Sequence, residues 1–526
     1  PTGYIKKKFT PRAETGTPFL QETQSQSWIE NDFLRLEIDP ERGGGIVSLV
    51  DKESGKEFIN RRHSLPANCV LALEQTGDSD PAIVSPRFPD GWEATGRTPA
   101  AFKYLEGPVT RRLLIRHGAP RLGSVIQEVR IYRELPYIDC YTILEDYPGN
   151  GYEAADTGRE NPPSGQTGRR DLFLLAFPLD LPGSLPVLED RFNARVIPRS
   201  RGGLEARPGT PSRAGHPAWS SCYRWVDVSW ALLVRFMNGK EEVSSLAVGP
   251  AEAVINRGRH SAIHHRLMMY LARHGVPCTP RFDTDDPGTD PFHRSSSFSL
   301  GTMEENAFTN RVLERNPEAK DYYERGLKDF GYVFLAAPED PQDPATSRPV
   351  FIFAGKTEAL LAQAVEDMIQ ATITHRWECP AAACFLRNRE NVEDFGFALL
   401  NRGTTLCGLE ADGALVTALT HTAPFLSPQT PWPFDFTEQK THIFQYRLIP
   451  HTGEWRHADI PRRAMEYNHE PHALAATPGD GPLRSRASFF SIEPNNILVS
   501  CIKPAGFPEA EYRTPQWKKT PVIIRV

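Results

Sequence analysis

The chain has 526 residues, with 60 basic against 66 acidic side chains and a net charge of −6. It therefore lacks the basic excess of a nucleic-acid-binding protein, and no run of about 18 apolar residues predicts a membrane-spanning helix. The 47 prolines and 39 glycines are spread along the chain, which favours many short strands joined by turns over long helical bundles.

The eight cysteines are scattered, and only Cys379 and Cys384 lie close together in the sequence. A structural zinc site needs a second such pair, which is missing, so we expect free, mostly buried thiols in a reducing compartment. The expected location is the cytoplasm, with a secreted or periplasmic location left open.

The first part of the chain is predicted to be β-rich after a polar tail or linker over residues 1–27. Apolar residues alternate along Leu34–Ile38, three glycines follow at 43–45, and further strands are predicted at Ile46–Val50 and Glu57–Asn60. Successive glycines permit positive φ angles, so they predict a tight turn. Strand patterns continue to about residue 240, which predicts the first part of a large β-sandwich over 28–240.

The pattern changes over residues 241–395, which we predict to be a mixed α/β insertion. Thr357–Ala371 is the clearest helix, because its apolar residues fall on one face and Thr357 is a favourable N-cap. Strand patterns return over 396–526, which predicts the second part of the sandwich. The fold class expected is thus mainly β, a supersandwich of the galactose-mutarotase type with an α/β insertion.

Five segments in this order resemble the all-β C-terminal region of glycoside hydrolase family 38, the α-mannosidase family. They lie within residues 28–240 and 396–526, and none lies in 241–395. The segments are Trp28–Asn60, Arg224–Ser229, Gly396–Asn401, Tyr446–Trp455 and Val522–Val526.

The resemblance implies a carbohydrate-binding and structural portion of an α-mannosidase-like glycoside hydrolase. In that family the nucleophilic aspartate and the catalytic zinc belong to an N-terminal module, for which we find no counterpart. The catalytic residues are therefore unknown, no cofactor is expected in this chain, and zinc is expected only in a catalytic module upstream or on a separate chain. We expect carbohydrate as the partner, with neither nucleic acid nor membrane; the oligomeric state stays open.

Five residues are the candidates for binding sugar. Aromatic faces stack on the C–H surfaces of sugars, while Arg, His and Asp can bind hydroxyl groups. The candidates are His216, Trp219, Arg224, Asp227 and His451. The alternative is that Trp225 is a core residue and that Asp227 only caps a turn.

Two other motifs resemble a phosphate-binding loop and a metal site, but neither is predicted to be one. Gly355–Thr357 resembles the end of a phosphate-binding loop, but the first glycine of that motif is absent at Val350, so a strand-to-helix turn is the simpler interpretation. His260, His264 and His265 are the densest histidine group, and hydrogen-bonded or solvated side chains explain them better than a metal site.

Two rival functions remain open. The chain could be a free-standing supersandwich enzyme, either an aldose epimerase or a polysaccharide lyase, which a convergent set of His, Tyr, Arg and acidic residues on one sheet would favour. It could instead be a non-catalytic carbohydrate-binding module, which exposed aromatic residues without a perturbed acid would favour.

Overall fold

The structure is a computed structural model that describes most of the chain in separate ranges of residues. These are 3–5, 21–23, 26–75, 93–119, 123–147, 170–190, 193–197, 220–238, 241–256, 258–285, 296–342, 348–374, 382–386, 394–403, 406–421, 440–471, 486–488, 490–494, 497–499, 501–504 and 522–525.

The chain divides into two compact units. The smaller comprises Pro1–Thr17 with Arg462–Val526, and the larger comprises Pro18–Pro461. The boundary falls within helix α5 (Ile460–Asn468). In the smaller unit two antiparallel pairs are described: β1 (Gly3–Ile5) with β29 (Arg486–Ser488), and β30 (Cys501–Pro504) with β31 (Val522–Arg525).

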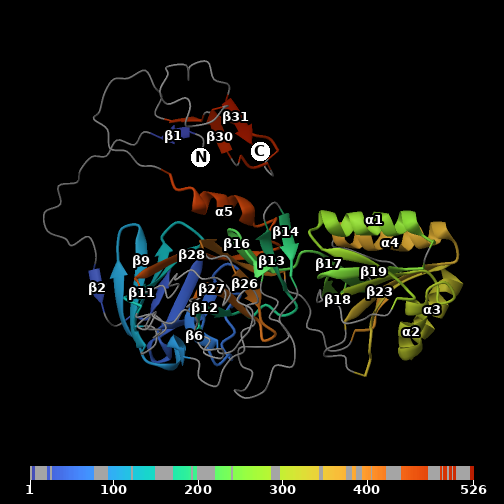
Figure 1. Cartoon of the computed structure of the whole chain (residues 1–526), viewed down its shortest axis with the longest axis horizontal. Coiled ribbons are helices and arrows are strands. Elements are labelled where there is room, and N and C mark those ends of the chain that lie inside the picture. The colour runs from blue at the N-terminus through green and yellow to red at the C-terminus, as the bar shows by residue number, and fades with distance from the viewer. Residues whose placement is uncertain are drawn as a thin grey trace, which may run out of the picture. The chain divides into compact units, whose positions relative to one another are not determined.

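Two antiparallel sheets form a β-sandwich in the larger unit (Figure 1). The ten-stranded sheet contains, in spatial order, β14 (Asn193–Val196), β13 (Leu185–Asp190), β16 (Trp225–Ser229), β25 (Phe395–Arg402), β28 (His442–Thr452), β11 (Ile138–Glu145), β10 (Gly123–Tyr132), β9 (Thr110–Ala119), β8 (Ala101–Glu106) and β2 (Gln21–Thr23). The six-stranded sheet contains β15 (Ser220–Ser221), β26 (Leu406–Leu409), β27 (Ala414–His421), β12 (Arg170–Pro178), β6 (Cys69–Gln75) and β7 (Glu93–Ala94).

Period-2 alternation places one face of each sheet in a shared core. Along β10, Val125, Gln127, Val129 and Ile131 are buried while the intervening residues are half-buried. The apolar members pack in one cluster with residues of the opposite sheet such as Phe177. The mainly β class with a large sandwich and an α/β insertion is thereby confirmed. Among the described residues, no helix is long and apolar enough to cross a membrane.

A three-stranded meander is present near the N-terminus, but its third strand is β3 (Trp28–Glu30), which precedes the two correctly predicted strands, and not the predicted strand at 57–60. It consists of β3, β4 (Leu34–Asp39) and β5 (Gly45–Asp51), and the turn between the last two has Gly43 at φ 70°. The prediction of a strand at Glu57–Asn60 was wrong. The carboxylate of Glu57 accepts hydrogen bonds from the backbone N–H groups of Leu49 and Ile59, and this segment forms only isolated bridges.

A three-layer α/β part follows in the chain. Its sheet has the order β20 (Cys278–Phe282), β19 (Ala251–Ile255), β21 (Ser296–Leu300), β23 (Pro349–Gly355), β22 (Tyr332–Pro338) and β24 (Ala382–Cys384). Its helices are α1 (Ser261–Arg273), α2 (Ala307–Arg315), α3 (Pro317–Asp329) and α4 (Glu358–Thr374), with α1 and α4 on one face and α2 and α3 on the other (Figure 1). A hairpin of β17 (Leu233–Asn238) and β18 (Glu241–Ala247) contacts α4.

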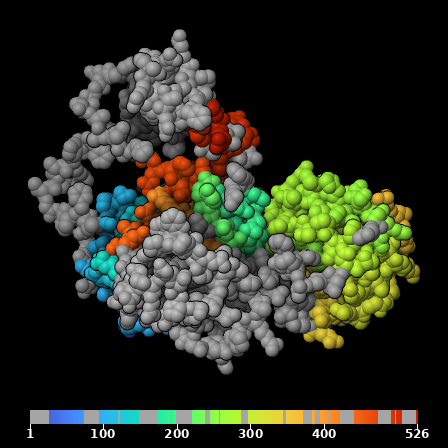
Figure 2. Space-filling view, in the orientation of Figure 1, coloured from blue at the N-terminus to red at the C-terminus, as the bar shows by residue number. Residues whose placement is uncertain are grey.

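The side chains of this part form one continuous body, coloured yellow-green to gold in Figure 2. The predicted helix is confirmed as α4, and its Leu360 N–H donates to the Thr357 hydroxyl at 3.3 Å. Gly355–Thr357 is therefore a strand-to-helix turn. The α/β part lies between β16 and β25 in sequence, yet these two strands pair directly, with Asp227 opposite Ala398. Their predicted proximity is confirmed.

Candidate functional site

Three of the segments that carry the family resemblance become adjacent strands. Arg224–Ser229 contains β16, Gly396–Asn401 lies in β25, and Tyr446–Trp455 contains most of β28. The sheet order is β16, β25, β28, so segments far apart in sequence lie side by side. Val226, Val228 and Leu448 belong to the sandwich core. Because side chains alternate along a strand, Asp227, Ser229 and His451 lie on the sheet face that points away from this core.

Asp227 and His451 form a buried ion pair across β25. The Nε2 atom of His451 lies 2.7 Å from Oδ1 of Asp227, and the two side chains are 6% and 0% exposed. The Ser229 hydroxyl donates to the other carboxylate oxygen. The His451 Nδ1 atom lies 3.3 Å from the carbonyl oxygen of Thr452.

Glycine at position 396 makes room for this pair. A Cβ atom on Gly396 would lie 2.3 Å from Cε1 of His451 and 2.9 Å from Cβ of Ser229. The imidazole ring therefore crosses β25 where that strand has no side chain. Any larger residue would displace the ring from Asp227.

We expect Gly396→Ala to lower the free energy of unfolding by about 1–3 kcal/mol, the usual range for overpacking. Chemical denaturation measures the change. The control is Gly118→Ala, because a Cβ atom there meets no atom within 4 Å in strand β9. Equal denaturation midpoints for the two variants would show that the His451 ring does not need the space left by the missing side chain of Gly396.

Glu454 lies next to the ion pair and is 7% exposed. Burial raises its pKa to about 7, and Asp227 adds to that rise, while the charges of Arg456 and His451 oppose it. The Arg456 Nη1 atom donates to Oε2 of Glu454 at 2.5 Å. An acid with a pKa near neutrality can both hold and release a proton at physiological pH.

Two tryptophans pack beside these charges. The rings of Trp225 and Trp455 have centroids 5.2 Å apart, and the guanidinium of Arg456 lies 4.3 Å from the Trp455 ring centroid. Trp225 is only 2% exposed, so its predicted position in a packed strand is confirmed. We call Asp227, Ser229, His451, Glu454 and Arg456 the outer-face cluster.

A second polar group lies on the same face of β28. Arg447 donates from Nε and Nη2 to the two oxygens of Asp139 at 2.6 and 2.9 Å, and its guanidinium lies 3.6 Å from the ring centroid of Tyr137. The Tyr132 hydroxyl donates to Asp139 at 2.7 Å. Arg447 and His451 are four residues apart on one strand, about 13 Å, so the two polar groups lie along the same face of β28.

Comparisons with known proteins yield neither a matching family model nor a curated relative. Among solved structures, an α-mannosidase from Enterococcus faecalis V583 superposes with a TM-score of 0.43 and 10% identity, over 94% of this chain and 35% of that chain. A glycosyl hydrolase family 38 protein from Enterococcus faecalis gives 0.41 and 10%, over 94% and 37%. A TPR-domain-containing protein from Parabacteroides distasonis ATCC 8503 gives 0.24 and 9%, over 87% and 49%.

This chain thus spans about a third of the length of the two mannosidase-family structures. At these TM-scores no role is transferred from them. The resemblance in the sequence segments and the geometry of the site are independent of the superpositions.

The sequence-predicted site residues fall into three groups. His216 and Trp219 lie outside the described residues. Arg224 donates from Nε to both oxygens of Glu189 at 3.1 and 3.0 Å and remains 30% exposed, so one acid already orients it. Asp227 and His451 meet in the outer-face cluster.

Sequence reasoning missed Glu454, Arg456 and Ser229. Glu454 belongs to the segment that carries the family resemblance, but nothing local signals that it is buried. Among the described residues, no group of three or more His, Cys, Asp or Glu side chains is placed to hold a metal ion.

Proposed function

We propose that this chain is the carbohydrate-binding and structural portion of an α-mannosidase-like glycoside hydrolase, and that a separate catalytic module supplies the reacting groups. One observation carries the proposal. The family-like segments, which are distant in sequence, converge on neighbouring strands, and their polar residues Asp227, His451 and Glu454 form one cluster.

Within this proposal the buried pair positions the surface rather than touching sugar. Asp227 and His451 have almost no exposed surface, so they hold β16 and β28 in register. The proposed direct contacts with sugar are made by more exposed side chains. Arg224 and Arg456 are two of these, and each is 30% exposed. Trp219 joins them as a proposed stacking residue.

Calorimetric titration of the whole chain with manno-oligosaccharides tests saccharide binding. We expect Trp219→Ala to weaken binding about fivefold, corresponding to roughly 1 kcal/mol for one stacked ring, with little change in melting temperature. Trp225→Ala is the comparison, because removing a buried tryptophan costs about 3–5 kcal/mol of stability. Equal effects on melting, with no effect on binding, would contradict the proposal.

We also expect the chain alone not to hydrolyse an aryl α-mannoside. Turnover that a chelator abolishes and zinc restores would show a complete metalloenzyme instead.

A free-standing enzyme of the supersandwich type is the second candidate. The supporting observation is the buried acid Glu454, whose pKa is raised to about 7 and which lies near His451, as an acid–base pair requires. Polarimetry with aldoses and absorbance assays with uronate polymers test this candidate. Activity lost in Glu454→Gln with the fold retained would favour it over the first proposal.

A further inference from the structure

In the sheet of the α/β part, the direction in which successive strands are added reverses between β19 and β21. The proposed carbohydrate function does not involve this position. β19 continues into α1 on one face of the sheet, while its parallel neighbour β21 leads to α2 on the opposite face (Figure 1). Loops after such strands leave in opposite directions. In open α/β sheets, ligands bind in the crevice at the carboxyl ends of these strands.

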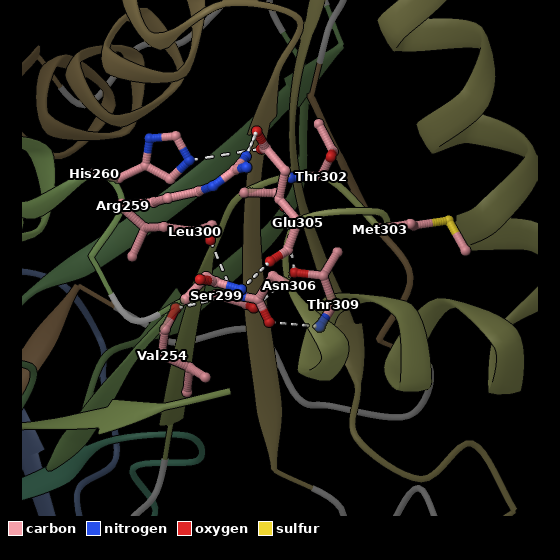
Figure 3. A network of polar contacts seen from close by, with 12 residues as sticks. Val254, Arg259, His260, Ser299, Leu300, Thr302, Met303, Glu305, Asn306 and Thr309 are labelled. Atoms are coloured by element: carbon pink, nitrogen blue, oxygen red, sulfur yellow. Dashed lines mark hydrogen bonds and ion pairs between the residues drawn. The ribbon is translucent and has the colours of Figure 1, made fainter. Parts of the chain in front are cut away.

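Charged residues from both loops meet at this point. Arg259 Nη1 donates to Oε1 of Glu305 at 2.8 Å, and Nε2 of His260 lies 3.5 Å from Oε2 of Glu305 (Figure 3). The backbone N–H of Thr302 donates to Oε2 at 3.2 Å. The carboxylate of Glu305 thus lies in a cradle of a guanidinium, an imidazole and a backbone N–H, which we call the Glu305 cradle.

The base of the cradle is fixed by a fully buried asparagine. Asn306 Nδ2 donates to the carbonyl oxygens of Val254 and Leu300 at 3.2 and 2.9 Å, which ties the ends of β19 and β21 together. Its Oδ1 accepts from the N–H groups of Phe308 and Thr309 and caps α2. The loop that carries Thr302 and Glu305 is therefore held to the sheet.

Donors remain beyond those that Glu305 uses. The His260 side chain is only 11% exposed, yet neither of its ring nitrogens has a hydrogen-bond partner among the described residues, since Nε2 approaches Glu305 only at an ion-pair distance of 3.5 Å. Arg259 is 58% exposed, so its guanidinium is accessible to solvent while one edge contacts Glu305. Buried polar atoms without partners are rare and call for an explanation, and a bound ligand is one.

The charges around Glu305 favour an anion at this position. Burial alone would raise the pKa of Glu305, but the Thr302 N–H and the charges of His260 and Arg259 outweigh it, so this pKa is lowered. The same groups would stabilise any oxyanion at that position.

We propose that the Glu305 cradle binds an oxyanion, a carboxylate or phosphate group of a small ligand, and that Glu305 occupies the position in the free protein. Arg259 and His260 are the recognising side chains. The ligand displaces the Glu305 carboxylate and takes over its hydrogen bonds. This site does not depend on saccharide binding by the sandwich.

Calorimetric titration with inorganic phosphate and, separately, with acetate tests the proposal. We expect Glu305→Ala to bind one of these ions at least tenfold more tightly than the wild-type chain, because the internal competitor is gone. Arg259→Gln in the Glu305→Ala background should remove the gain. The ion that binds more tightly identifies a phosphate or a carboxylate ligand.

Two matched controls accompany these variants. Glu304→Ala removes the neighbouring exposed acid, and Arg266→Gln removes an exposed arginine of α1 that pairs with Glu366 instead. Both should leave anion affinity unchanged. If Glu305→Ala does not fold, the wild-type chain is titrated with phosphate instead, and the NMR signals of the histidine imidazoles are monitored. Saturable chemical-shift changes of His260 would support the site.

Equal affinity of folded Glu305→Ala and Glu304→Ala for both ions would overturn the proposal. So would the absence of any saturable His260 shift in the wild-type titration when Glu305→Ala does not fold. In either case the cradle only joins two loops of the chain.

Discussion

Asp227→Ala is expected to lower the free energy of unfolding by about 3–5 kcal/mol, the range found when one partner of a buried ion pair is removed. The substitution leaves the His451 ring, 6% exposed, without its carboxylate acceptor and leaves the Ser229 hydroxyl without the acceptor it uses now. Urea denaturation followed by tryptophan fluorescence measures the loss, because Trp225 and Trp455 lie beside the pair.

The matched control is Glu366→Ala, which removes an acid from an exposed pair with Arg266. Exposed pairs contribute about 0–1 kcal/mol, so this variant should unfold almost like the wild type. A double variant of Asp227→Ala with His451→Ala should lose less than the two single losses added together. Similar, small losses for Asp227→Ala and Glu366→Ala would rule out a structural role for the buried pair.

Glu454→Gln is expected to change how stability depends on pH. The folded chain holds the Glu454 proton up to a pKa of about 7, compared with the ordinary value of 4.5. Between these values the folded state binds more protons than the unfolded state, so the contribution of Glu454 is full below pH 4.5 and declines until about pH 7. The difference corresponds to about 3 kcal/mol.

Glutamine cannot lose a proton, so Glu454→Gln should become more stable relative to the wild type as the pH rises from 4.5 to 7.5. Unfolding free energies of both proteins at several pH values in this range measure the difference. Glu314→Gln is the control, because Glu314 is 55% exposed and pairs with Lys320 at the surface. A Glu454→Gln profile parallel to the wild type would mean that Glu454 is ionised throughout this range.

Local features of the sequence determined the type of several elements. Alternation of apolar residues predicted strands such as β10, and the apolar face after Thr357 predicted α4. These predictions succeed because side-chain direction has period 2 in a strand and about 3.6 in a helix, whatever the distant parts of the chain do. The local pattern wrongly predicted a strand at Glu57, where the side-chain carboxylate accepts the backbone hydrogen bond from Leu49.

Asp227 and His451 were sequence candidates as single residues, and only the tertiary structure decided that they form a pair. They are 224 positions apart, and Arg259 and Glu305 are 46 positions apart. Each pairing depends on which strands become neighbours and how their registers align, which no local period encodes. The same holds for Glu454, since its pKa depends on burial and on neighbouring charges that tertiary packing brings around it.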